Sequence, residues 1–313
     1  MIVHQSYAQR FLKKVREGSL TYPLLLSGPQ GIGKRSSVIQ LAREIWCEAD
    51  STKQGCECSS CYQIRQNTFP DLTILTPEGG QNYGVDVIRK LIGTITDMPT
   101  YGSVRLVVID SVEAMTNEAS NAFLKCLEEP PSHIRFLLLT SNMSEVIPTI
   151  RSRCGLVPFD KLPFDFVRKL VLTLTQDEST VDTYVRMGAG SAGRSLRYAI
   201  NNTLMVRDQV LTILENSSKK QILRCFSALE DTDASPELLF DLLEQLAGDL
   251  IKVAVGAGTL THADQKDTLK ALAQTKDLAF WYSWYHEIES IMRSNGAPKL
   301  QIKYLISQLA KSV

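Results

Sequence analysis

The chain has 313 residues, enough for two or three domains, and 44% of them are hydrophobic and 22% are charged. This composition is that of an ordinary globular protein, and no stretch approaches the roughly 20 consecutive apolar residues of a membrane span. The 34 basic and 34 acidic residues cancel, which argues against a protein that binds DNA alone, because phosphate contacts favour a basic surface. The first 20 residues lack the apolar core of a signal peptide, so we expect a cytoplasmic protein.

Short apolar runs alternate with helical patterns over the first 160 or so residues, which predicts a parallel sheet covered by helices. Each run is rich in Leu, Ile or Val, as expected of strands buried on both faces. The predicted strands are Pro23–Ser27, Leu72–Thr76, Arg105–Asp110, Arg135–Thr140 and Leu156–Phe159. The predicted helices are Arg35–Glu48, Val85–Met98 and Asn117–Glu128, the last of which ends before Pro130–Pro131.

The pattern changes at Lys161-Leu162-Pro163, after which no buried strand follows. Residues 164–202 predict short helices broken by glycines, and the chain is helical in character from about residue 205. We therefore predict an α/β domain at 1–162, a small helical lid at 163–205 and a helical C-terminal domain at 206–313. The long amphipathic segments of that last domain are Pro236–Val255, His262–Gln274 and Lys299–Ala310.

A phosphate-binding loop is predicted at Gly28-Pro-Gln-Gly-Ile-Gly33-Lys34, because this segment follows a buried strand and opens a helix. In such a loop Gly28, Gly31 and Gly33 let backbone N–H groups converge on phosphate oxygens. The helix N-terminus adds positive potential, and Lys34 adds a point charge. The alternative is a glycine-rich turn followed by a surface lysine.

The nucleotide site that this loop would serve lacks two groups. Arg35 stands where the full motif has Ser or Thr, whose hydroxyl ligates Mg²⁺. The apolar run that ends in Asp110 resembles a Walker B strand, and Asp110 is a candidate for holding Mg²⁺ through water. Active ATPases of this kind place a glutamate next, whereas this chain has Ser111, with Glu113 two residues further on. ATP or ADP binding is compatible with this pattern, but hydrolysis is not expected; alternatively, Asp110 caps the following helix.

Several motifs together resemble the clamp-loader subunits of bacterial DNA polymerase III, the delta-prime kind more closely than the gamma/tau kind. In chain order they are the phosphate loop, a cysteine cluster, Phe69-Pro-Asp-Leu72, the Walker B strand, Asn121-Ala-Phe-Leu-Lys-Cys-Leu-Glu-Glu-Pro-Pro131 and Arg151-Ser-Arg-Cys154. The resemblance is dense over residues 20–160 and thin beyond 205. It implies an AAA+ P-loop-type α/β fold with a five-stranded parallel sheet, then a helical lid and an all-α collar domain.

The resemblance also implies a ring of five AAA+ modules that opens a sliding clamp and places it on primer-template DNA. The expected partners are the gamma/tau and delta subunits, the sliding clamp and DNA, as part of the DNA polymerase III holoenzyme. Arg153 would then be an arginine finger that reaches the ATP site of the next subunit, where a planar guanidinium stabilises charge on the transferring phosphoryl group. The alternative for Arg153, and the better interpretation of Arg151, is an ion pair with a surface carboxylate.

Three features favour the delta-prime kind, which gives a finger but does not hydrolyse ATP. Arg35 and Ser111 do not fit a site that must turn over. In the lid, Gly190-Ser-Ala-Gly-Arg194 places Gly193 where gamma/tau subunits have a phosphate-sensing arginine, although Arg194 and Arg197 lie nearby. The chain is also shorter than a tau subunit. The alternative is a catalytically active ATPase subunit of the gamma/tau kind.

Four of the seven cysteines, Cys47, Cys56, Cys58 and Cys61, crowd into fifteen positions. In a cytoplasmic chain such a cluster predicts a structural Cys₄ zinc site at about 47–61. Cys56 and Cys58 are separated by one residue where related subunits have two, so a turn near Gly55 would be needed to bring both to one ion. The alternatives are unligated thiols and a redox pair, Cys58–Cys61. A free-standing zinc-dependent nucleic-acid factor is a third class of function compatible with this cluster.

Overall fold

The computed structural model describes residues 10, 13–20, 22–49, 56–77, 82–95, 97–175, 177–215, 235–292, 294 and 296–310. The chain divides into two compact units, Met1–Leu162 and Pro163–Val313. Among the described residues, no helix has both the length and the apolar character of a membrane span.

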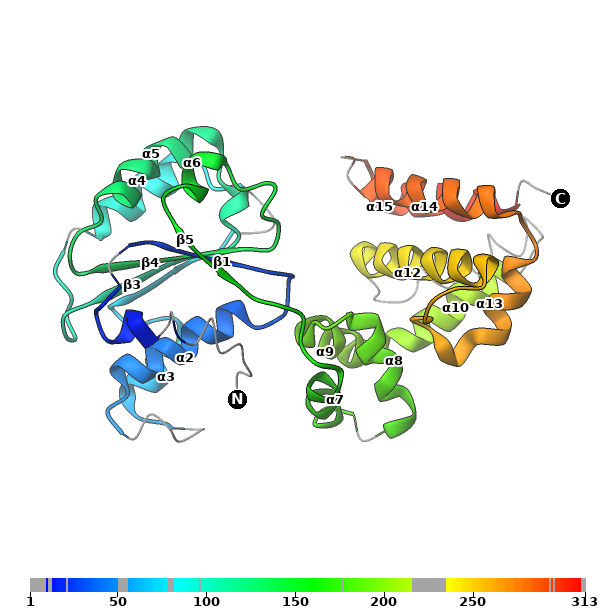
Figure 1. Ribbon diagram of the computed structural model, residues 1–313, viewed down its shortest axis with the longest axis horizontal. Coiled ribbons are helices and arrows are strands. Elements are labelled where there is room, and N and C mark those ends of the chain that lie inside the picture. Colours follow the sequence, from blue (N-terminus) through cyan, green and yellow to red (C-terminus); the bar gives the residue numbers. More distant parts are fainter. Residues whose placement is uncertain are drawn as a thin grey trace. The chain divides into compact units, whose positions relative to one another are not determined.

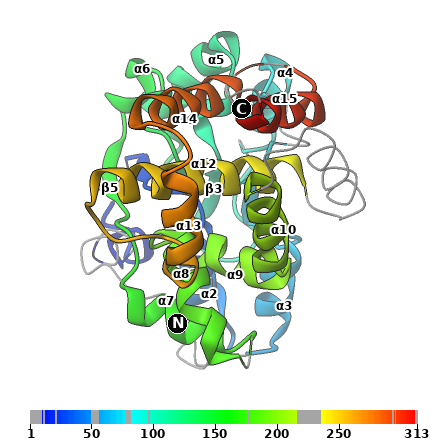
Figure 2. The same ribbon diagram turned by 90° about the vertical axis from the view of Figure 1, so that its right-hand side faces the viewer.

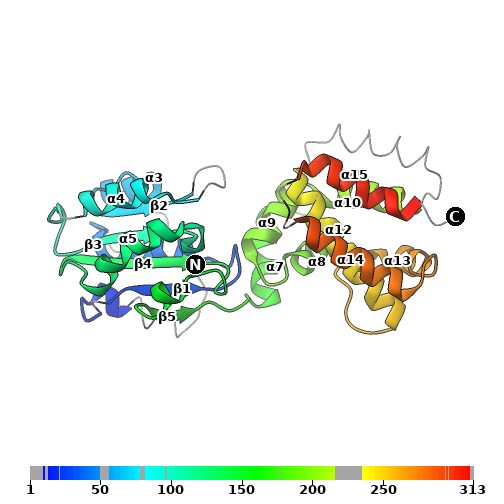
Figure 3. The same cartoon turned by 90° about the horizontal axis from the view of Figure 1, so that it is seen from above.

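The first unit is built on a five-stranded parallel sheet. Its strands are β1 (Leu24–Ser27), β2 (Leu72–Leu75), β3 (Arg105–Ile109), β4 (Ile134–Thr140) and β5 (Gly155–Pro158), in the spatial order β2-β3-β4-β1-β5 (Figure 3). All four pairings are parallel. Consecutive strands β3 and β4 are neighbours, whereas β1 inserts between β4 and β5, so the centre of the sheet is the point where the strand order reverses. Ligands of open α/β sheets bind at the carboxyl ends of strands at such a point.

Helices cover both faces of this sheet (Figure 1). One face packs against α2 (Lys34–Trp46) and α3 (Ser59–Gln66), and the other against α4 (Val85–Thr94), α5 (Asn117–Glu128) and α6 (Pro148–Arg151). Successive strand residues serve opposite faces, because side chains alternate along a strand. In β3, Leu106 and Val108 join the first core and Val107 and Ile109 join the second, and all four are fully buried.

The predicted fold class is confirmed. Each end of a strand either agrees with the predicted end or differs from it by one residue. Helix α4 ends at Thr94, four residues before the predicted end. There the Thr94 hydroxyl donates to the carbonyl of Leu91 at 2.8 Å, and Pro99 follows shortly after. The residue before a proline avoids helical geometry, which shortens helices that approach one. Helix α3, within the cysteine region, was not predicted.

The described residues of the second unit form helices and the loops that connect them, with no strand among them. Its first helices are α7 (Phe164–Leu172), α8 (Glu178–Gly188) and α9 (Ala192–Ile200), which pack on one another. Gly188 is required there, because a Cβ atom at this position would lie 1.9 Å from the Ser195 hydroxyl. The remaining elements are α10 (Thr203–Glu215), α12 (Pro236–Val255), the short 3₁₀ turn η3 (Ala263–Gln265), α13 (Lys266–Ala273), α14 (Leu278–Met292) and α15 (Pro298–Ala310).

Helix α12 is the centre of the later helices, with α13, α14 and α15 packed against it (Figure 2). The aromatic run 280–285 lies on α14, where Trp281 and Trp284 are each only 2% exposed. The Trp281 indole N–H donates to the carbonyl of Ala273 at 3.3 Å, and that of Trp284 to the carbonyl of Leu305 at 3.1 Å. These two indole rings are therefore core residues. The division of this unit into lid and collar stays a prediction.

Candidate functional site

The predicted phosphate loop joins the carboxyl end of β1 to the amino end of α2, at the edge where the strand order reverses. Gly31 and Gly33 have φ angles of 76° and 99°, a region that favours glycine. Gly28 is required for space instead, because a Cβ atom there would lie 2.2 Å from the carbonyl oxygen of Phe159. The loop therefore has the backbone of a phosphate-binding turn, with each of its three glycines needed where it stands.

The ammonium of Lys34 turns back into this loop. Its Nζ donates to the carbonyls of Gly28 at 2.6 Å and Pro29 at 2.9 Å, and the residue is only 9% exposed. Burial lowers the pKa of Lys34, while the nearby carboxylates of Asp110 and Glu113 oppose that shift. A lysine held in this way is not a surface residue, which favours the phosphate loop over the plain turn.

Arg35 lies directly against the candidate magnesium ligand. Its Nη1 is 3.6 Å from Oδ2 of Asp110, which follows β3, and it donates to the Thr76 hydroxyl beyond β2 at 3.4 Å. Burial raises the pKa of the Asp110 carboxyl, although Arg35 and Lys34 oppose the rise. The guanidinium therefore supplies the positive charge that a Mg²⁺ ion would otherwise bring to this carboxylate. Gly28, Gly31, Gly33, Lys34 and Asp110 do come together, but around an arginine.

Three further polar residues at this edge were not singled out as site residues from the sequence. The Tyr83 hydroxyl donates to the backbone carbonyl of Asp110 at 2.6 Å. Oε1 of Glu113 accepts from the Ser141 N–H at 3.0 Å and from its hydroxyl at 2.8 Å, at the end of β4. Glu113 is thus hydrogen-bonded at the end of the neighbouring strand. It does not replace the glutamate that active ATPases have at the position of Ser111. The sequence places Glu113 near Asp110 but does not give its partner, and it does not show that Tyr83 and Ser141 lie at this edge.

Arg153 lies at the opposite edge of the same sheet. It follows α6 and lies two residues before the start of β5, so it belongs to the amino ends of the strands, whereas the phosphate loop leaves the carboxyl end of β1. Because β1 and β5 are parallel and in register over four residues, the two edges are separated by roughly 10–13 Å of strand. Arg153 and the chain's own phosphate loop therefore face different sides of the domain.

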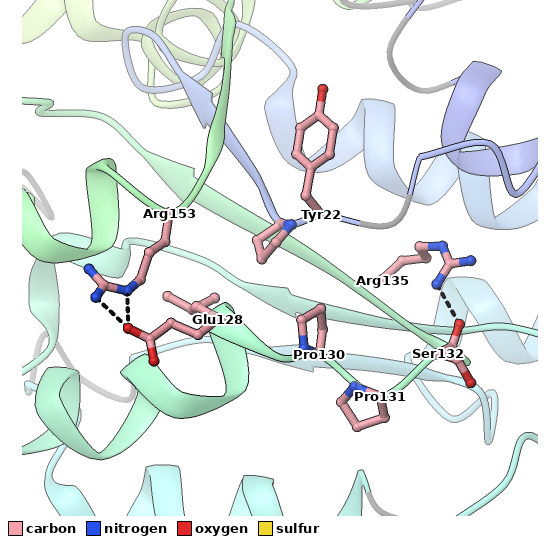
Figure 4. Close-up of a pocket in the computed structure, with 9 residues that line it drawn as sticks. Tyr22, Glu128, Pro130, Pro131, Ser132, Arg135 and Arg153 are labelled. Carbon is pink, nitrogen blue, oxygen red and sulfur yellow. Dashed lines mark hydrogen bonds and ion pairs between the residues drawn. The ribbon is translucent and has the colours of Figure 1, made fainter.

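In the isolated chain the Arg153 guanidinium contacts Glu128, the last residue of α5 (Figure 4). Its Nε donates to Oε1 of Glu128 at 2.8 Å, its Nη2 contacts the same oxygen, and Nη1 donates to the carbonyl of Thr149 at 3.0 Å. This is the surface ion pair that the alternative interpretation of Arg153 anticipated. The pair borders an open pocket of about 530 Å³, whose other lining residues are Tyr22, Pro23, Leu127, Pro130, Pro131, Ser132 and Arg135.

The lid arginines considered as displaced phosphate sensors are held within the second unit. Arg194 and Arg197 lie 3.5 and 3.4 Å from Oδ2 of Asp241 on α12. Arg194 also donates to the Tyr198 hydroxyl at 3.1 Å, and that hydroxyl donates to Asp241 at 2.9 Å. Both guanidinium groups therefore pair with one carboxylate. These ion pairs link α9 to α12, so the two arginines have a structural role.

The four clustered cysteines meet in space despite their irregular spacing. The sulfurs of Cys47, Cys56, Cys58 and Cys61 all lie within 4.8 Å of one another. The Cys47 sulfur is 3.6 Å from that of Cys56 and 3.9 Å from that of Cys58. A tetrahedral ion with bonds of about 2.3 Å holds its sulfurs about 3.8 Å apart. The donor set therefore fits zinc. Gly55, proposed for the turn, lies outside the described residues.

The acid–base properties of this cluster also fit a cation. Backbone N–H groups of Cys61 and Glu48 lower the pKa of Cys58 to about 6, whereas burial raises the pKa of Cys47 to about 12. Sulfurs this close cannot all be thiolates without a positive charge among them. A divalent ion would supply that charge and favour deprotonation of all four.

The segment Phe69-Pro-Asp-Leu72 turns out to position a loop. The Asp71 carboxylate is fully buried and accepts from the N–H groups of Thr100 at 2.9 Å and Tyr101. Arg105, at the start of β3, lies 3.4 Å from it. The Phe69 ring packs between Trp46 and Tyr101, with centroids 4.9 and 5.1 Å away. This motif therefore fixes the path between α4 and β3.

A family model described as DNA polymerase III, delta subunit, matches residues 3–163, half of the chain. The chain belongs to this family, whose matched region is the sheet unit that carries the phosphate loop, the cysteines and Arg153. Among curated relatives, the chain is 26% identical over 268 residues to DNA polymerase III subunit delta′ of Escherichia coli, covering 85% of this chain and 80% of the relative. It is 37% identical over 132 residues to the delta′ subunit of Pseudomonas aeruginosa, covering 42% and 40% of the two chains.

A second group of relatives carries a different subunit name. The chain is 32% identical over 201 residues to DNA polymerase III subunit gamma/tau of Mycobacterium tuberculosis, covering 62% of this chain. It spans only about a third of the length of that relative, 33%. Among solved structures, a DNA polymerase III gamma subunit-related protein from Thermotoga maritima superposes with a TM-score of 0.54 at 19% identity, over 98% of this chain and 99% of the other. That likeness supports the fold.

Proposed function

We propose that this chain is a delta-prime-like subunit of the DNA polymerase III clamp loader, and that it supplies Arg153 in trans to the ATP site of a neighbouring ATPase subunit. The observation that carries the proposal is the position of Arg153 at the amino edge of the sheet, while the chain's own phosphate loop lies at the carboxyl edge. A guanidinium on that edge has no route to its own nucleotide, so it serves another molecule or none.

The chain's own nucleotide site supports a role without turnover. Arg35 approaches Asp110 at 3.6 Å, where a productive site needs a magnesium ion. The hydroxyl that would ligate that ion and the acid that would polarise water are both missing. The loop remains shaped for phosphate, so ADP or ATP could bind through backbone N–H groups without being hydrolysed.

The contact between Arg153 and Glu128 is compatible with exchange for a nucleotide. The two side chains are 31% and 50% exposed, and exposed ion pairs contribute roughly 0–1 kcal/mol. A triphosphate at a subunit interface offers a larger negative charge in a drier setting, where the same guanidinium is worth far more. Glu128 would then hold the finger in the free subunit and release it on assembly.

The decisive measurement is ATP turnover by the purified chain, alone and after reconstitution with gamma/tau and delta subunits. We expect no magnesium-dependent turnover by the chain alone, and a rate in the complex that depends on Arg153. Appreciable turnover by the chain alone would overturn the proposal. It would favour the second candidate, an active ATPase of the gamma/tau kind, which the 32% identity to gamma/tau relatives keeps in view.

A structural zinc ion held by Cys47, Cys56, Cys58 and Cys61 is part of the proposal. It would close the connection between α2 and α3 and supply no chemistry, because four thiolates leave no open position. Elemental analysis of the purified chain should give close to one zinc per molecule. A metal-free preparation with full thermal stability would remove zinc from the structural account.

The partners proposed for the chain are the gamma/tau and delta subunits, the sliding clamp and primer-template DNA within the ring. Its relatives are DNA polymerase III subunits, which supports the polymerase III setting. The cytoplasmic location expected from the sequence stays a prediction.

A further inference from the structure

A pocket in the second unit lies between the carboxyl end of α12, the chain that follows it and α13. Its volume is about 670 Å³, which is within the usual size range of ligand pockets. Four of its lining residues are lysines, Lys252, Lys266, Lys270 and Lys276, and none is acidic. We propose that this pocket docks a short acidic peptide segment of a partner protein, one that also carries an apolar side chain.

The charge of the pocket is only partly compensated by its surroundings. Lys252 binds the buried Asp249 at 3.0 Å, and Lys270 lies 4.0 Å from Asp267, whose side chain is completely exposed. Within the described ranges no ion pair is recorded for Lys266, which is exposed on the first turn of α13. Four ammonium groups thus border one concave surface, and in the part of the chain that the structure describes the only carboxylate partner close to the exposed Lys270 is itself fully exposed. Such a surface attracts anionic partners and sets their orientation.

One wall of the pocket is rigidly held. The chain after α12 returns to Asp249, whose carboxylate is 0% exposed. That carboxylate accepts from the N–H groups of Thr261 at 3.0 Å and His262 at 2.8 Å, and lies 3.1 Å from the His262 ring. Gly258, which lines the wall, has a φ of 82°. A wall fixed by a buried carboxylate is formed before any ligand arrives, which reduces the ordering cost of binding.

The apolar lining decides between two classes of anion. Val253, Leu260 and Leu278 line the same pocket, and Leu278 is 38% exposed although it is a large hydrophobic residue. A nucleic-acid backbone would satisfy the lysines but leave these side chains uncovered. A peptide that combines Asp or Glu with Leu or Phe satisfies both, in the manner of interfaces with an apolar centre and a charged rim. The pocket is therefore a protein-docking site rather than a DNA contact.

The test is fluorescence anisotropy with the full-length chain and a labelled ten-residue peptide in which Asp and Glu alternate with Leu and Phe. The same sequence with Asn and Gln in place of the acids, and an all-acidic peptide without Leu or Phe, are the comparison probes. We expect saturable binding of the first peptide only, weakened by salt. The double variant Lys266→Glu/Lys270→Glu should lose at least about tenfold in affinity, and Leu278→Asn about threefold.

The matched control is Lys169→Glu/Lys299→Glu, which reverses two exposed lysines of the same unit outside the pocket. It should bind like the unaltered chain, and circular dichroism should show all variants folded. Equal loss in the control would reduce the effect to net charge and overturn the proposal. Tighter binding of a single-stranded oligonucleotide, with the same dependence on Lys266 and Lys270, would overturn it in favour of a nucleic-acid site.

Discussion

Arg35 and Arg153 both contact a carboxylate, but at opposite edges of one sheet. Arg35 contacts Asp110, which directly follows a buried strand and whose side chain is 24% exposed. Arg153 contacts Glu128, which is half exposed and lies at the end of a helix. The two pairs differ in the enclosure of the carboxylate and not of the arginine, because the Arg35 and Arg153 side chains are 46% and 31% exposed. An exposed carboxylate such as Glu128 can be replaced by another anion at little cost in free energy. Under the proposed function, an arginine–carboxylate pair closes the nucleotide site at one edge, and a similar pair keeps Arg153 available for a neighbouring subunit at the other.

The largest expected effect comes from removing the reserve cation. Arg153→Ala should lower turnover at the neighbouring ATP site by roughly 10³-fold or more, because an arginine finger contributes about that much in related enzymes. Steady-state ATPase assays compare the complex that contains Arg153→Ala with the unaltered complex, and the loss of rate gives the part of the total turnover that comes from this site. Arg151→Ala, two residues away, is the control and should leave the rate unchanged. Equal rates for both variants would remove Arg153 from the mechanism.

The second effect concerns the closed edge. Arg35→Thr removes the guanidinium and restores the hydroxyl that ligates magnesium, so magnesium-dependent ATP binding should tighten by about tenfold. Turnover should stay absent, because Ser111 still occupies the position of the water-polarising acid. Titration with a fluorescent nucleotide, with and without Mg²⁺, gives the answer. Unchanged affinity would mean that Arg35 does not block the metal position.

The pKa of Asp110 predicts a third, smaller effect on stability. A carboxyl whose pKa is raised on folding costs stability above its folded pKa, and the cost disappears as pH falls toward the ordinary value near 3.9. Asp110→Asn should therefore stabilise the chain at neutral pH by no more than about 1 kcal/mol, with the gain vanishing at acid pH. Thermal unfolding as a function of pH tests this. Destabilisation at neutral pH would show that the ion pair with Arg35 outweighs burial.

The smallest effect should come from Glu128→Gln. The exposed pair with Arg153 contributes at most about 1 kcal/mol, so folding should be nearly unchanged. Turnover by the complex should stay within about twofold of the original, because the finger itself is intact. A loss as large as that of Arg153→Ala would show that the carboxylate is needed during catalysis and does not merely hold the free arginine.

The sheet was predictable from the sequence because its strands are buried on both faces, which leaves short uninterrupted runs of Leu, Ile and Val. The same logic failed for α3, where eight residues dominated by Ser, Cys and Gln carry too little apolar periodicity. The phosphate loop and Asp110 were found from strand context. An ion pair of Arg153 with a surface carboxylate was one of two alternatives, but its partner Glu128 was not predicted, because the pair joins residues 25 positions apart through side chains whose rotamers the sequence does not fix.

Local geometry also explains the part of the cysteine prediction that spacing alone left doubtful. An extended Cys56-x-Cys58 segment would place the two sulfurs on opposite sides. The folded chain instead makes Cys58 the cap of α3, with its sulfur accepting from the Cys61 N–H at 3.5 Å. The turn of the chain into helix α3 therefore brings the sulfurs together, although the spacing of the cysteines is irregular.

The ammonium of Lys34 turns inward, so this residue also bears on the stability of its own loop. Its ammonium donates to two carbonyls of the loop that precedes α2, and these hydrogen bonds hold the loop in its conformation. Substitutions that remove the chemistry of this site therefore need not change the conformation of the loop. Lys34 thus stabilises the loop, and its removal should first lower the melting temperature of the domain.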